Sequence, residues 1–375
     1  MHVIQIASVQ PSKDWRLFEN IPEMLHSENP YFLPPFPGSV SRLHKKRHPF
    51  HRHGEIFPFV ALRDGKPVGR IAAIINETHN AFHNDRTGFF GFFDFIDDMG
   101  VASHLFEAAE QVISARGRQS MRGPYNPTQN DQCGLLVDGF DAFPFIEMPY
   151  NPPYYIGIYE ALQLNQVRDL YAFHASRDVV PPGRIVRAAD RLRRQTAIKV
   201  RCVNRKNVRR EIQIVRQLFN SALDGEWGFM PITFDDLDFA VRELKVILDP
   251  ALMLIAEVDD KPIGFAVTIP NVNEFMVAAK RSRGLLRLLK LAWYVQTRRP
   301  RQLRLAILAV NKDYRAKGVA PALYLETLSR WTQPYHGGEI SWVQDINTEM
   351  IKVIELMGGK RSKIYRILEK VVSAD

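Results

Sequence analysis

The sequence lacks several features that would each assign it to a particular class of protein. Its 375 residues contain only two cysteines, so no disulfide framework is implied and a reducing cytoplasm is the expected compartment. No apolar run approaches the roughly 20 residues that a membrane-spanning helix needs. The N-terminal residues also lack the basic region and apolar core of a secretory signal. We therefore expect a protein that does not cross a membrane.

What is present fits a globular protein with an anionic partner. Hydrophobic residues make up 46% of the chain and charged residues 24%, which is the balance of a soluble, folded protein. A length of 375 residues fits two domains of ordinary size. The formal net charge of +9 favours an anionic partner, such as a phosphorylated cofactor, nucleic acid or acidic lipid.

Acidic residues are missing from one segment, residues 276–304, which contains nine basic residues. Within it Leu285, Leu288, Leu289, Ala292 and Trp293 fall on one helical face. A basic helix with such a face is typical of a helix lying in a lipid interface. The alternative is a helix packed on its own domain with a solvated basic face. A nucleic-acid partner is indicated by the charge alone. The sequence has no zinc-finger or RNA-binding signature, so we do not expect nucleic acid to bind.

A basic loop contains three closely spaced histidines, His48, His51 and His53. Their spacing would suit a metal ion, but no cysteine lies nearby, and the neighbouring Lys and Arg side chains would repel a cation. We expect a solvated or phosphate-facing loop there and no metal site.

The stretch Leu303–Thr327 reads as a strand, a turn and a helix. Apolar residues lead into Val310, and the turn carries Arg315-Ala316-Lys317-Gly318-Val319-Ala320. Small residues at such a turn let backbone N–H groups approach a ligand, and the helix N-terminus adds partial positive charge. The turn is therefore a candidate cradle for a diphosphate, with an ordinary strand-to-helix turn as the alternative.

The order of elements repeats at domain scale. The sequence VALRDGKPVGRIAAI, with its Asp-Gly hairpin signal, matches LIAEVDDKPIGFAVTI further along. A first copy is expected at residues 1–178, a basic linking helix at 179–198, and a second copy at 199–375 with the insertion at 276–304. Where the cradle would sit, the first copy has Asp97 and Asp98, which would repel a diphosphate. We therefore expect the cradle only in the second copy.

This combination closely resembles the GNAT superfamily of acyl-CoA N-acyltransferases, whose coenzyme A-binding pattern is Arg/Gln-x-x-Gly-x-Gly/Ala. The resemblance covers nearly the whole chain. The length, the segment GPYNPTQNDQ and the basic Leu/Trp insertion look most like bacterial ceramide synthases and their relatives. The resemblance implies an α/β fold with two GNAT-like domains in tandem, each a mixed central sheet flanked by helices.

The resemblance also implies roles for residues of the second copy. In GNAT enzymes the acyl group lies where two adjacent strands splay apart at a bulge, and here these would end at Val310 and near Gln344. Backbone N–H groups of Leu308 and Val310 would polarise the thioester carbonyl. The residues implied in holding the pyrophosphate and the pantetheine arm are Arg315, Lys317, Gly318, Val319, Ala320 and Asn347.

The attacking amine must lose a proton to a base within hydrogen-bond reach. The candidates are Glu226, in a loop, and Asp345, at a strand end, and each also reads as a solvated or capping carboxylate. GNAT enzymes commonly carry a tyrosine on the last helix as general acid, but here that position is Ile354. The matching Tyr159 lies in the first copy. Three explanations remain: the thiolate leaves without a general acid, another residue serves as the acid, or the second domain is inactive. We favour the first.

The sequence thus predicts an acyl-CoA-dependent N-acyltransferase that moves a fatty acyl group to the amine of a long-chain, sphingoid-type base. Acyl-CoA is the co-substrate, and no permanently bound cofactor is expected. The first copy, with the segment Gly123–Tyr155, would shape the acceptor site, and Arg283–Trp293 would hold this cytoplasmic protein at the inner face of an anionic membrane. The alternatives are a GNAT N-acetyltransferase of a small soluble amine and a non-catalytic acyl-CoA-binding protein.

Overall fold

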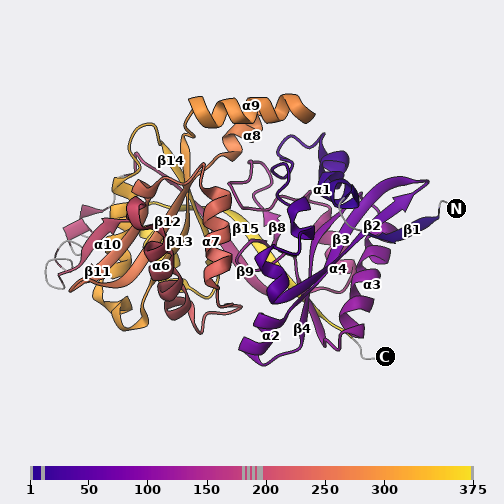
Figure 1. Ribbon diagram of the computed structural model, residues 1–375, viewed down its shortest axis with the longest axis horizontal. Helices are drawn as coiled ribbons and strands as arrows, with labels where there is room; N and C mark the ends of the chain where they lie inside the picture. The colour runs from indigo at the N-terminus through magenta and orange to yellow at the C-terminus, as the bar shows by residue number, and fades with distance from the viewer. Residues whose placement is uncertain are drawn as a thin grey trace. The chain divides into compact units, whose positions relative to one another are not determined.

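The computed structural model describes residues 3–9, 13–179, 182–183, 186–187, 191 and 197–372. The chain divides into two compact units, Met1–Leu170 with Lys363–Asp375, and Tyr171–Ser362 (Figure 1). This division differs from the predicted domains, because the boundary falls within strands β9 (Asn165–Ser176) and β15 (Lys360–Val371). Most of the predicted linking helix, residues 179–198, lies outside the described residues.

The first unit is a mixed sheet with the strand order β1-β2-β3-β4-β5-β15, and β8 also pairs with β15. Its strands are β1 (Ile4–Ser8), β2 (Gly54–Arg63), β3 (Lys66–Asn76), β4 (Thr87–Phe95), β5 (Ser120–Gly123) and β8 (Leu135–Asp138). Two short strands, β6 (Tyr125–Asn126) and β7 (Gln132–Cys133), pair with each other in a separate sheet. Its helices are α1 (Lys13–His26), α2 (Glu77–His83), α3 (Met99–Ala115), α4 (Tyr155–Ala161) and the 3₁₀ helices η1 (Ser41–His44) and η2 (Pro49–Arg52).

Local sequence explains the first hairpin and the core above it. The turn between β2 and β3 contains Asp64 and Gly65, both with positive φ, as the Asp-Gly signal predicts. In α3, Leu105 and Phe106 lie on the side of the helix that packs on the strands. Both are buried in one cluster with Phe90 of β4. An apolar stripe on a helix and an apolar sheet face thus close the first core.

The second unit places its strands in the order β10-β11-β12-β13-β14, followed by β9. These strands are β10 (Lys199–Cys202), β11 (Met253–Val258), β12 (Lys261–Pro270), β13 (Gln302–Val310) and β14 (Gly337–Gln344). The helices are α6 (Val208–Leu223), α7 (Phe234–Leu244), α8 (Asn273–Ala279), α9 (Gly284–Thr297), α10 (Val319–Ser329), α11 (Thr348–Leu356), η3 (Arg205–Asn207), η4 (Pro250–Leu252) and η5 (Lys312–Lys317).

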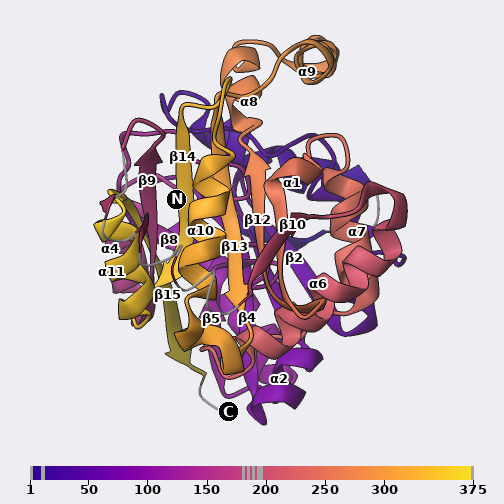
Figure 2. The same ribbon diagram turned by 90° about the vertical axis from the view of Figure 1, so that its left-hand side faces the viewer.

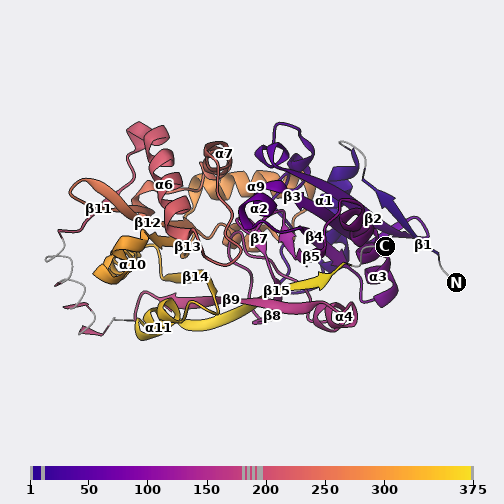
Figure 3. The same cartoon turned by 90° about the horizontal axis from the view of Figure 1, so that it is seen from below.

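Helices cover both faces of the second sheet (Figures 2 and 3). α10 buries Leu323 against the face that carries Leu305, and Ile354 of α11 belongs to the same cluster. α6 buries Phe219 in another cluster with Ala309. β13 therefore lies in the middle of this unit, between its two apolar layers.

Both units run through the same order of elements: a strand, a helical segment, a hairpin, a further strand, and then alternating helices and strands. In each unit the strand that follows the hairpin runs parallel to the next strand along the chain: β4 to β5 in the first unit, and β13 to β14 in the second. The predicted fold class is confirmed: the protein is an α/β chain in which a large mixed sheet is flanked by helices.

The basic insertion forms α8 and α9, between the end of β12 and the start of β13 (Figure 2). α9 is attached through Leu291, which is buried, and through Tyr294, which stacks on Phe275 with 5.7 Å between ring centroids. Its predicted apolar face is exposed, since Leu285 is 71% and Trp293 50% accessible to solvent. This face therefore does not pack on its own domain. No helix among the described residues is long and apolar enough to cross a membrane.

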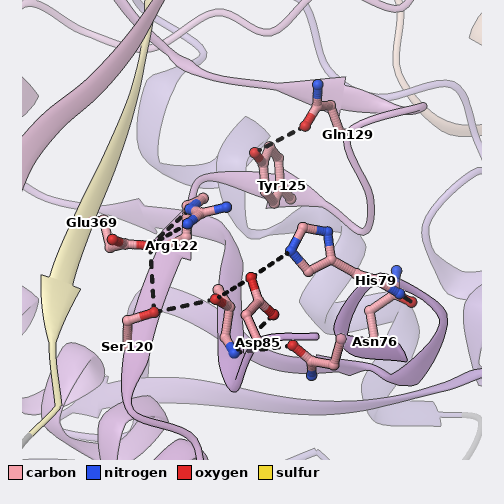
Figure 4. Close-up of polar contacts among 10 residues, drawn as sticks. Asn76, His79, Asp85, Ser120, Arg122, Tyr125, Gln129 and Glu369 are labelled. Atoms are coloured by element: carbon pink, nitrogen blue, oxygen red, sulfur yellow. Dashed lines mark hydrogen bonds and ion pairs between the residues drawn. The ribbon is translucent and has the colours of Figure 1, made fainter. Parts of the chain in front are cut away.

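A polar network joins the last strand to the first unit (Figure 4). Arg122 of β5 donates from Nε to Glu369 Oε2 of β15 at 2.7 Å. Ser120 Oγ lies 3.3 Å from both Glu369 Oε2 and Thr87 Oγ1, and Thr87 Oγ1 donates to Asp85 Oδ2 at 3.1 Å. Residues from the far end of the chain thus complete the first unit.

Candidate active site

β13 and β14 pair with each other only over the first part of their length. Their parallel register joins Gln302–Leu305 to Gly337–Ile340 and stops there. Both strands continue beyond it, as Ala306–Val310 and Ser341–Gln344. We call these two segments the splay. Backbone groups that face the splay are not used by the ladder between the two strands.

A β-bulge lies at the start of the splay. In the antiparallel pair β12–β13, Val267 faces Ile307, but the next residue, Thr268, faces Leu305. Ala306 is therefore an extra residue on β13, and such a residue bends a strand and increases its twist. The expected combination of a bulge and two diverging strands is present in the second unit.

Two backbone N–H groups face into the splay. Asn311 N, directly after β13, donates to Ile263 O at 2.8 Å, which continues the hydrogen bonding between β12 and β13 by one residue. Neighbouring residues of a strand direct their N–H groups to opposite sides, so those of Leu308 and Val310 point away from β12. They point toward β14, where the ladder has already ended at Leu305. Both N–H groups are therefore directed into the space between the two diverging strands.

The turn after β13 brings a helix N-terminus to the end of the splay. η5 (Lys312–Lys317) ends at Gly318, whose φ of +75° is the left-handed conformation that favours glycine. α10 begins at Val319, and no described side chain caps it. Because Pro321 has no N–H, the first-turn donors are the N–H groups of Val319 and Ala320. The predicted strand, turn and helix are confirmed.

Arg315 contacts the end of α6. Its Nη2 donates to Ala222 O at 2.5 Å and to Glu226 Oε1 at 3.0 Å. Two predicted site residues are thus brought together as an ion pair, whose side chains are 47% and 31% exposed. Lys317 lies over the ring of Tyr314, with Nζ 4.5 Å from the centroid. A diphosphate that approaches α10 would compete with Glu226 for Arg315.

The loop after α6 is also bonded to the end of β14. Gln344 Nε2 donates to Trp227 O at 3.0 Å. Asp345 follows directly and is half-buried. Asn347 caps α11, because its Oδ1 accepts a hydrogen bond from Met350 N at 3.2 Å. The structure therefore places Asp345 at a strand end and Asn347 at a helix start, beside the splay.

The positions considered for a general acid are closed to solvent. Ile354 is fully buried in the core of the second unit. Tyr159 is fully buried in the core of the first unit, stacked on Tyr155 with 6.3 Å between ring centroids. Burial raises the pKa of the Tyr159 phenol well above its ordinary value. In the described structure Tyr159 is a packing residue, and it belongs to a different unit from Glu226 and Asp345.

In the first unit the chain that follows β5 stays against β4, so the corresponding position is occupied. β4 pairs with β5 only over Thr87–Phe89 and then continues. Beyond that point Asn126 Oδ1 accepts a hydrogen bond from Phe92 N at 2.6 Å. A Cβ on Gly91 would lie 1.6 Å from Tyr125 O. The residues that follow β5 therefore fill the position that is unpaired in the second unit.

The corresponding helix N-terminus in the first unit, that of α3, is capped by the carboxylate of Asp98. Asp98 Oδ1 accepts a hydrogen bond from Val101 N at 3.1 Å, and Asp98 Oδ2 accepts one from Arg63 at 2.6 Å. The hydrogen bond from Arg63 lowers the pKa of Asp98, so the carboxylate stays ionised. A negative charge at this position takes the place that a phosphate would occupy at a helix N-terminus.

Three polar residues beside the splay are not among those that the sequence singled out. Arg304 and Glu339 face each other in the β13–β14 register, and Ser341 follows the last paired residue of β14. All three are buried, with exposed fractions of 6%, 1% and 2%. Their sequence context contains a signal, because a charged residue interrupts each otherwise apolar strand, LRLAIL and GGEISW. Charged side chains are rarely buried without partners, so such positions indicate a polar network.

Comparisons with known proteins define the class of this protein. No protein-family model matches the chain. A tandem GNAT protein from the clavulanic acid biosynthesis pathway aligns over 100% of both chains, with a TM-score of 0.59 and 10% identity. A GCN5-related N-acetyltransferase from Sphaerobacter thermophilus aligns over 98% of this chain and 96% of its own, with a TM-score of 0.51 and 13% identity. These similarities show the fold: two GNAT domains in tandem.

Two relatives in sequence are more specific. The bacterial ceramide synthase of Caulobacter vibrioides (strain NA1000 / CB15N) is 30% identical over 379 residues, 98% of each chain. Protein YghO of Escherichia coli (strain K12) is 30% identical over 365 residues, 96% of this chain and 93% of its own. The chain therefore belongs to the family of the bacterial ceramide synthase and protein YghO. Fold and family together support an acyltransferase.

Proposed function

We propose that this protein is an acyl-CoA-dependent N-acyltransferase that moves a fatty acyl group to the amine of a long-chain, sphingoid-type base. The observation that carries the proposal is the splay, in which the N–H groups of Leu308 and Val310 face the space beside the start of α10. Donors aimed at a carbonyl oxygen stabilise the negative charge that develops on it during acyl transfer. The 30% identity to a ceramide synthase over 98% of the chain supports this choice of acceptor.

Acyl-CoA would bind with its diphosphate at the start of α10. The N–H groups of Val319 and Ala320 would donate to phosphate oxygens, and Gly318 leaves room for their approach. Arg315 and Lys317 would add positive charge beside them. Asn347 would contact the pantetheine arm. Acyl-CoA is a co-substrate in this proposal, and no permanently bound cofactor takes part.

In the reaction the amine nitrogen would attack the thioester carbonyl carbon, and the carbon–sulfur bond would break. Glu226 and Asp345 are the carboxylates that the sequence offers as acceptors for the proton of the amine. Glu226 is paired with Arg315 at the cradle, whereas Asp345 follows β14 directly. With Ile354 at the usual tyrosine position, the coenzyme A thiolate would leave unassisted.

α9 would bring the enzyme to its acceptor at an anionic membrane surface. A long-chain amine partitions into membranes, and α9 exposes Leu285, Leu289 and Trp293. Lys290 is exposed within the same helix. Apolar side chains inserted among lipid head groups, next to basic residues that attract anionic lipids, are the features of an interfacial helix. The protein would act in the cytoplasm, peripherally attached to the inner membrane face.

The test is a mass-spectrometric search for N-acylated product. Purified protein is incubated with palmitoyl-CoA or acetyl-CoA and a panel of amines that includes a sphingoid base. The proposal expects product from palmitoyl-CoA and the long-chain amine. The Gly318→Glu variant, which places a carboxylate at the diphosphate position, should form none.

Two other outcomes would replace the proposal. Product only from acetyl-CoA and a soluble amine would identify a GNAT N-acetyltransferase with a small acceptor. Coenzyme A binding without thiol release from any amine would identify a non-catalytic acyl-CoA-binding protein, for which the buried Ile354 is the supporting observation.

A further inference from the structure

The buried polar residues beside the splay form a directed chain of hydrogen bonds. Arg304 Nε donates to Ser341 Oγ at 2.9 Å, and Ser341 Oγ donates to Glu339 Oε1 at 2.6 Å. A guanidinium only donates and a serine hydroxyl has one proton, so the direction of the chain is fixed. The Ser341 proton points at the carboxylate of Glu339. One lone pair of Ser341 Oγ remains for a further donor.

These side chains lie on the α6 face of the second sheet. Leu303 and Leu305 belong to the cluster on the α10 face, so Arg304 between them points to the opposite side. Ile307 and Ala309 pack in the cluster against α6. Ser341 bonds to Arg304 and therefore lies on that same face, next to the bulge.

On this face of the sheet, β12 and β13 are partly exposed at the bulge. Ile307 packs in the cluster against α6 but is only half-buried, whereas Leu305 and Ala309 on the same strand are buried. Val267, which pairs with Ile307, is the one half-buried residue of β12 between Ile263 and Pro270. α7, which follows α6, has no buried side chain among its described residues. The middle of a central strand is normally covered, so this partly exposed position is the side from which a substrate would approach.

We propose that Ser341 and Glu339 form the proton relay for the attacking amine, with Arg304 as the residue that positions Ser341. This proposal rests on the proposed acyl transfer and names the group that handles its proton. The amine would enter over Ile307 and donate an N–H to the remaining lone pair of Ser341 Oγ.

The relay balances with the bonds that form and break. As the nitrogen bonds to the carbonyl carbon, its proton passes to Ser341 Oγ, and the Ser341 proton passes to Glu339 Oε1. The carbon–sulfur bond breaks and the thiolate takes a proton from solvent. Glu339 then returns its proton to water through Ser341, which restores the starting state.

The experiment compares Glu339→Gln, Glu339→Asp and Ser341→Ala with a matched control, Glu211→Gln. Glu211 is also buried and accepts hydrogen bonds from an arginine, Arg201, at 3.0 and 3.2 Å, but it lies on α6 outside the splay. Thiol release is measured against pH with palmitoyl-CoA and the long-chain amine, and coenzyme A binding by calorimetry.

The relay predicts that Glu339→Gln lowers kcat about 100-fold, the usual contribution of a general base, with KM for both substrates and coenzyme A binding unchanged. Its residual kcat should keep rising with pH where the wild-type value levels off. Ser341→Ala should lose about 10-fold or more in kcat. Glu339→Asp should recover part of the loss, and Glu211→Gln should behave as wild type in kcat and pH profile.

Wild-type kcat and pH profile in Glu339→Gln would overturn the relay, as would the same loss in Glu211→Gln. A collapse of kcat in Asp345→Asn or Glu226→Gln, with full activity in Glu339→Gln, would assign the base to those carboxylates. If Glu339→Gln does not fold, Ser341→Ala decides the question by the same measurements. Absence of acyl transfer in the wild-type protein would instead reject the proposed function, which separates the two failures.

Discussion

At the scale of single residues, Gly318 is the position where conformation and charge are both constrained. Its φ of +75° lies in the region that costs other residues about 1–2 kcal/mol. It also caps α10 without a side chain, so the first N–H groups of the helix remain open to an anion. Any side chain at this position strains the turn, but only an acidic one should also repel the ligand.

Gly318→Ala and Gly318→Glu separate these two effects. Both variants should lose a similar 1–2 kcal/mol of unfolding free energy, because both place a Cβ in left-handed backbone. Gly318→Ala should keep most of its coenzyme A affinity, whereas Gly318→Glu should bind at least about 10-fold more weakly, the equivalent of 1.4 kcal/mol. Calorimetric titration with coenzyme A and thermal unfolding measure both quantities. Equal binding by the two variants would remove Gly318 from the diphosphate site.

His79 is a buried base with a consequence for the pH dependence of stability. Its Nε2 lies 3.4 Å from Asp85 Oδ2 (Figure 4). The centroid of its ring lies 4.8 Å from that of the Phe89 ring. Burial lowers the pKa of His79 to about 4, although Asp85 opposes the shift. The unfolded chain has the ordinary value of about 6.5. His79 is therefore neutral in the folded protein at pH values where the unfolded chain already binds a proton.

The free energy of unfolding should fall as the pH is lowered from about 6.5 to 4, because only the unfolded state gains a proton there. The contribution of His79 reaches about 3 kcal/mol at most. His79→Gln should flatten this part of the curve, and the exposed His104→Gln should leave it as in the wild type. Denaturant unfolding at several pH values provides the measurement. An unchanged slope in His79→Gln would show that His79 is not the group responsible.

At the scale of secondary-structure elements, α9 is the exception to the usual burial of apolar faces. Only Arg287 and Leu291 of its residues are buried, and Leu285, Leu286, Leu288, Leu289 and Trp293 are exposed. Arg287 Nε donates to Ser282 O at 2.8 Å and helps to hold the base of the helix. Several exposed leucines on one helix form a patch of the kind that marks an interaction surface.

Replacing Leu285, Leu289 and Trp293 by serine should remove three of the five exposed apolar side chains of this patch without opening the core. We expect binding to vesicles that contain anionic lipid to fall by about 10-fold or more, since each side chain contributes up to 1.5–3 kcal/mol when buried. Three exposed apolar residues elsewhere, Met24, Val208 and Val246, provide a serine-substituted control of equal size. Vesicle sedimentation measures the binding. Equal binding by the two triple variants would contradict a lipid role for α9.

At the scale of the whole molecule, the end of the chain is part of the first unit. β15 pairs with β8 over Ile364–Arg366 and with β5 over Leu368–Val371, and Tyr365 and Leu368 are buried. Arg122 and Glu369 add an ion pair at 2.7 Å. A fragment cut at the predicted boundary, residue 178, would therefore lack a strand of its own sheet.

A chain that ends at residue 362 should lose the first unit's stability while retaining the splay. Two or more buried side chains and a strand are removed, so the first unit should unfold about 10 °C or more lower. A chain that ends at residue 372 is the control, because it keeps all of β15. Limited proteolysis followed by mass spectrometry identifies which unit is cut first. Equal protection of residues 13–170 in the two truncated chains would contradict this assignment.

The sequence by itself determined what depends on neighbours along the chain. The hairpin at Asp64-Gly65 and the turn at Gly318 follow from local backbone preferences. Helical periodicity also indicated that α9 has an apolar face. These features lie within a few residues of sequence, where turn chemistry and periodicity act, so the repeated order of elements was predictable as well.

Only the tertiary structure decided which distant residues meet. Arg304 and Ser341 are 37 residues apart and bond across two parallel strands, and Arg315 reaches Glu226 across 89. Asn126 bonds to Phe92 of β4 across 34 residues, so the chain of the first unit occupies the position that is unpaired in the second. No local preference encodes such contacts, because strand order and helix packing set them. The candidate proton relay therefore became visible only when the strands were placed side by side.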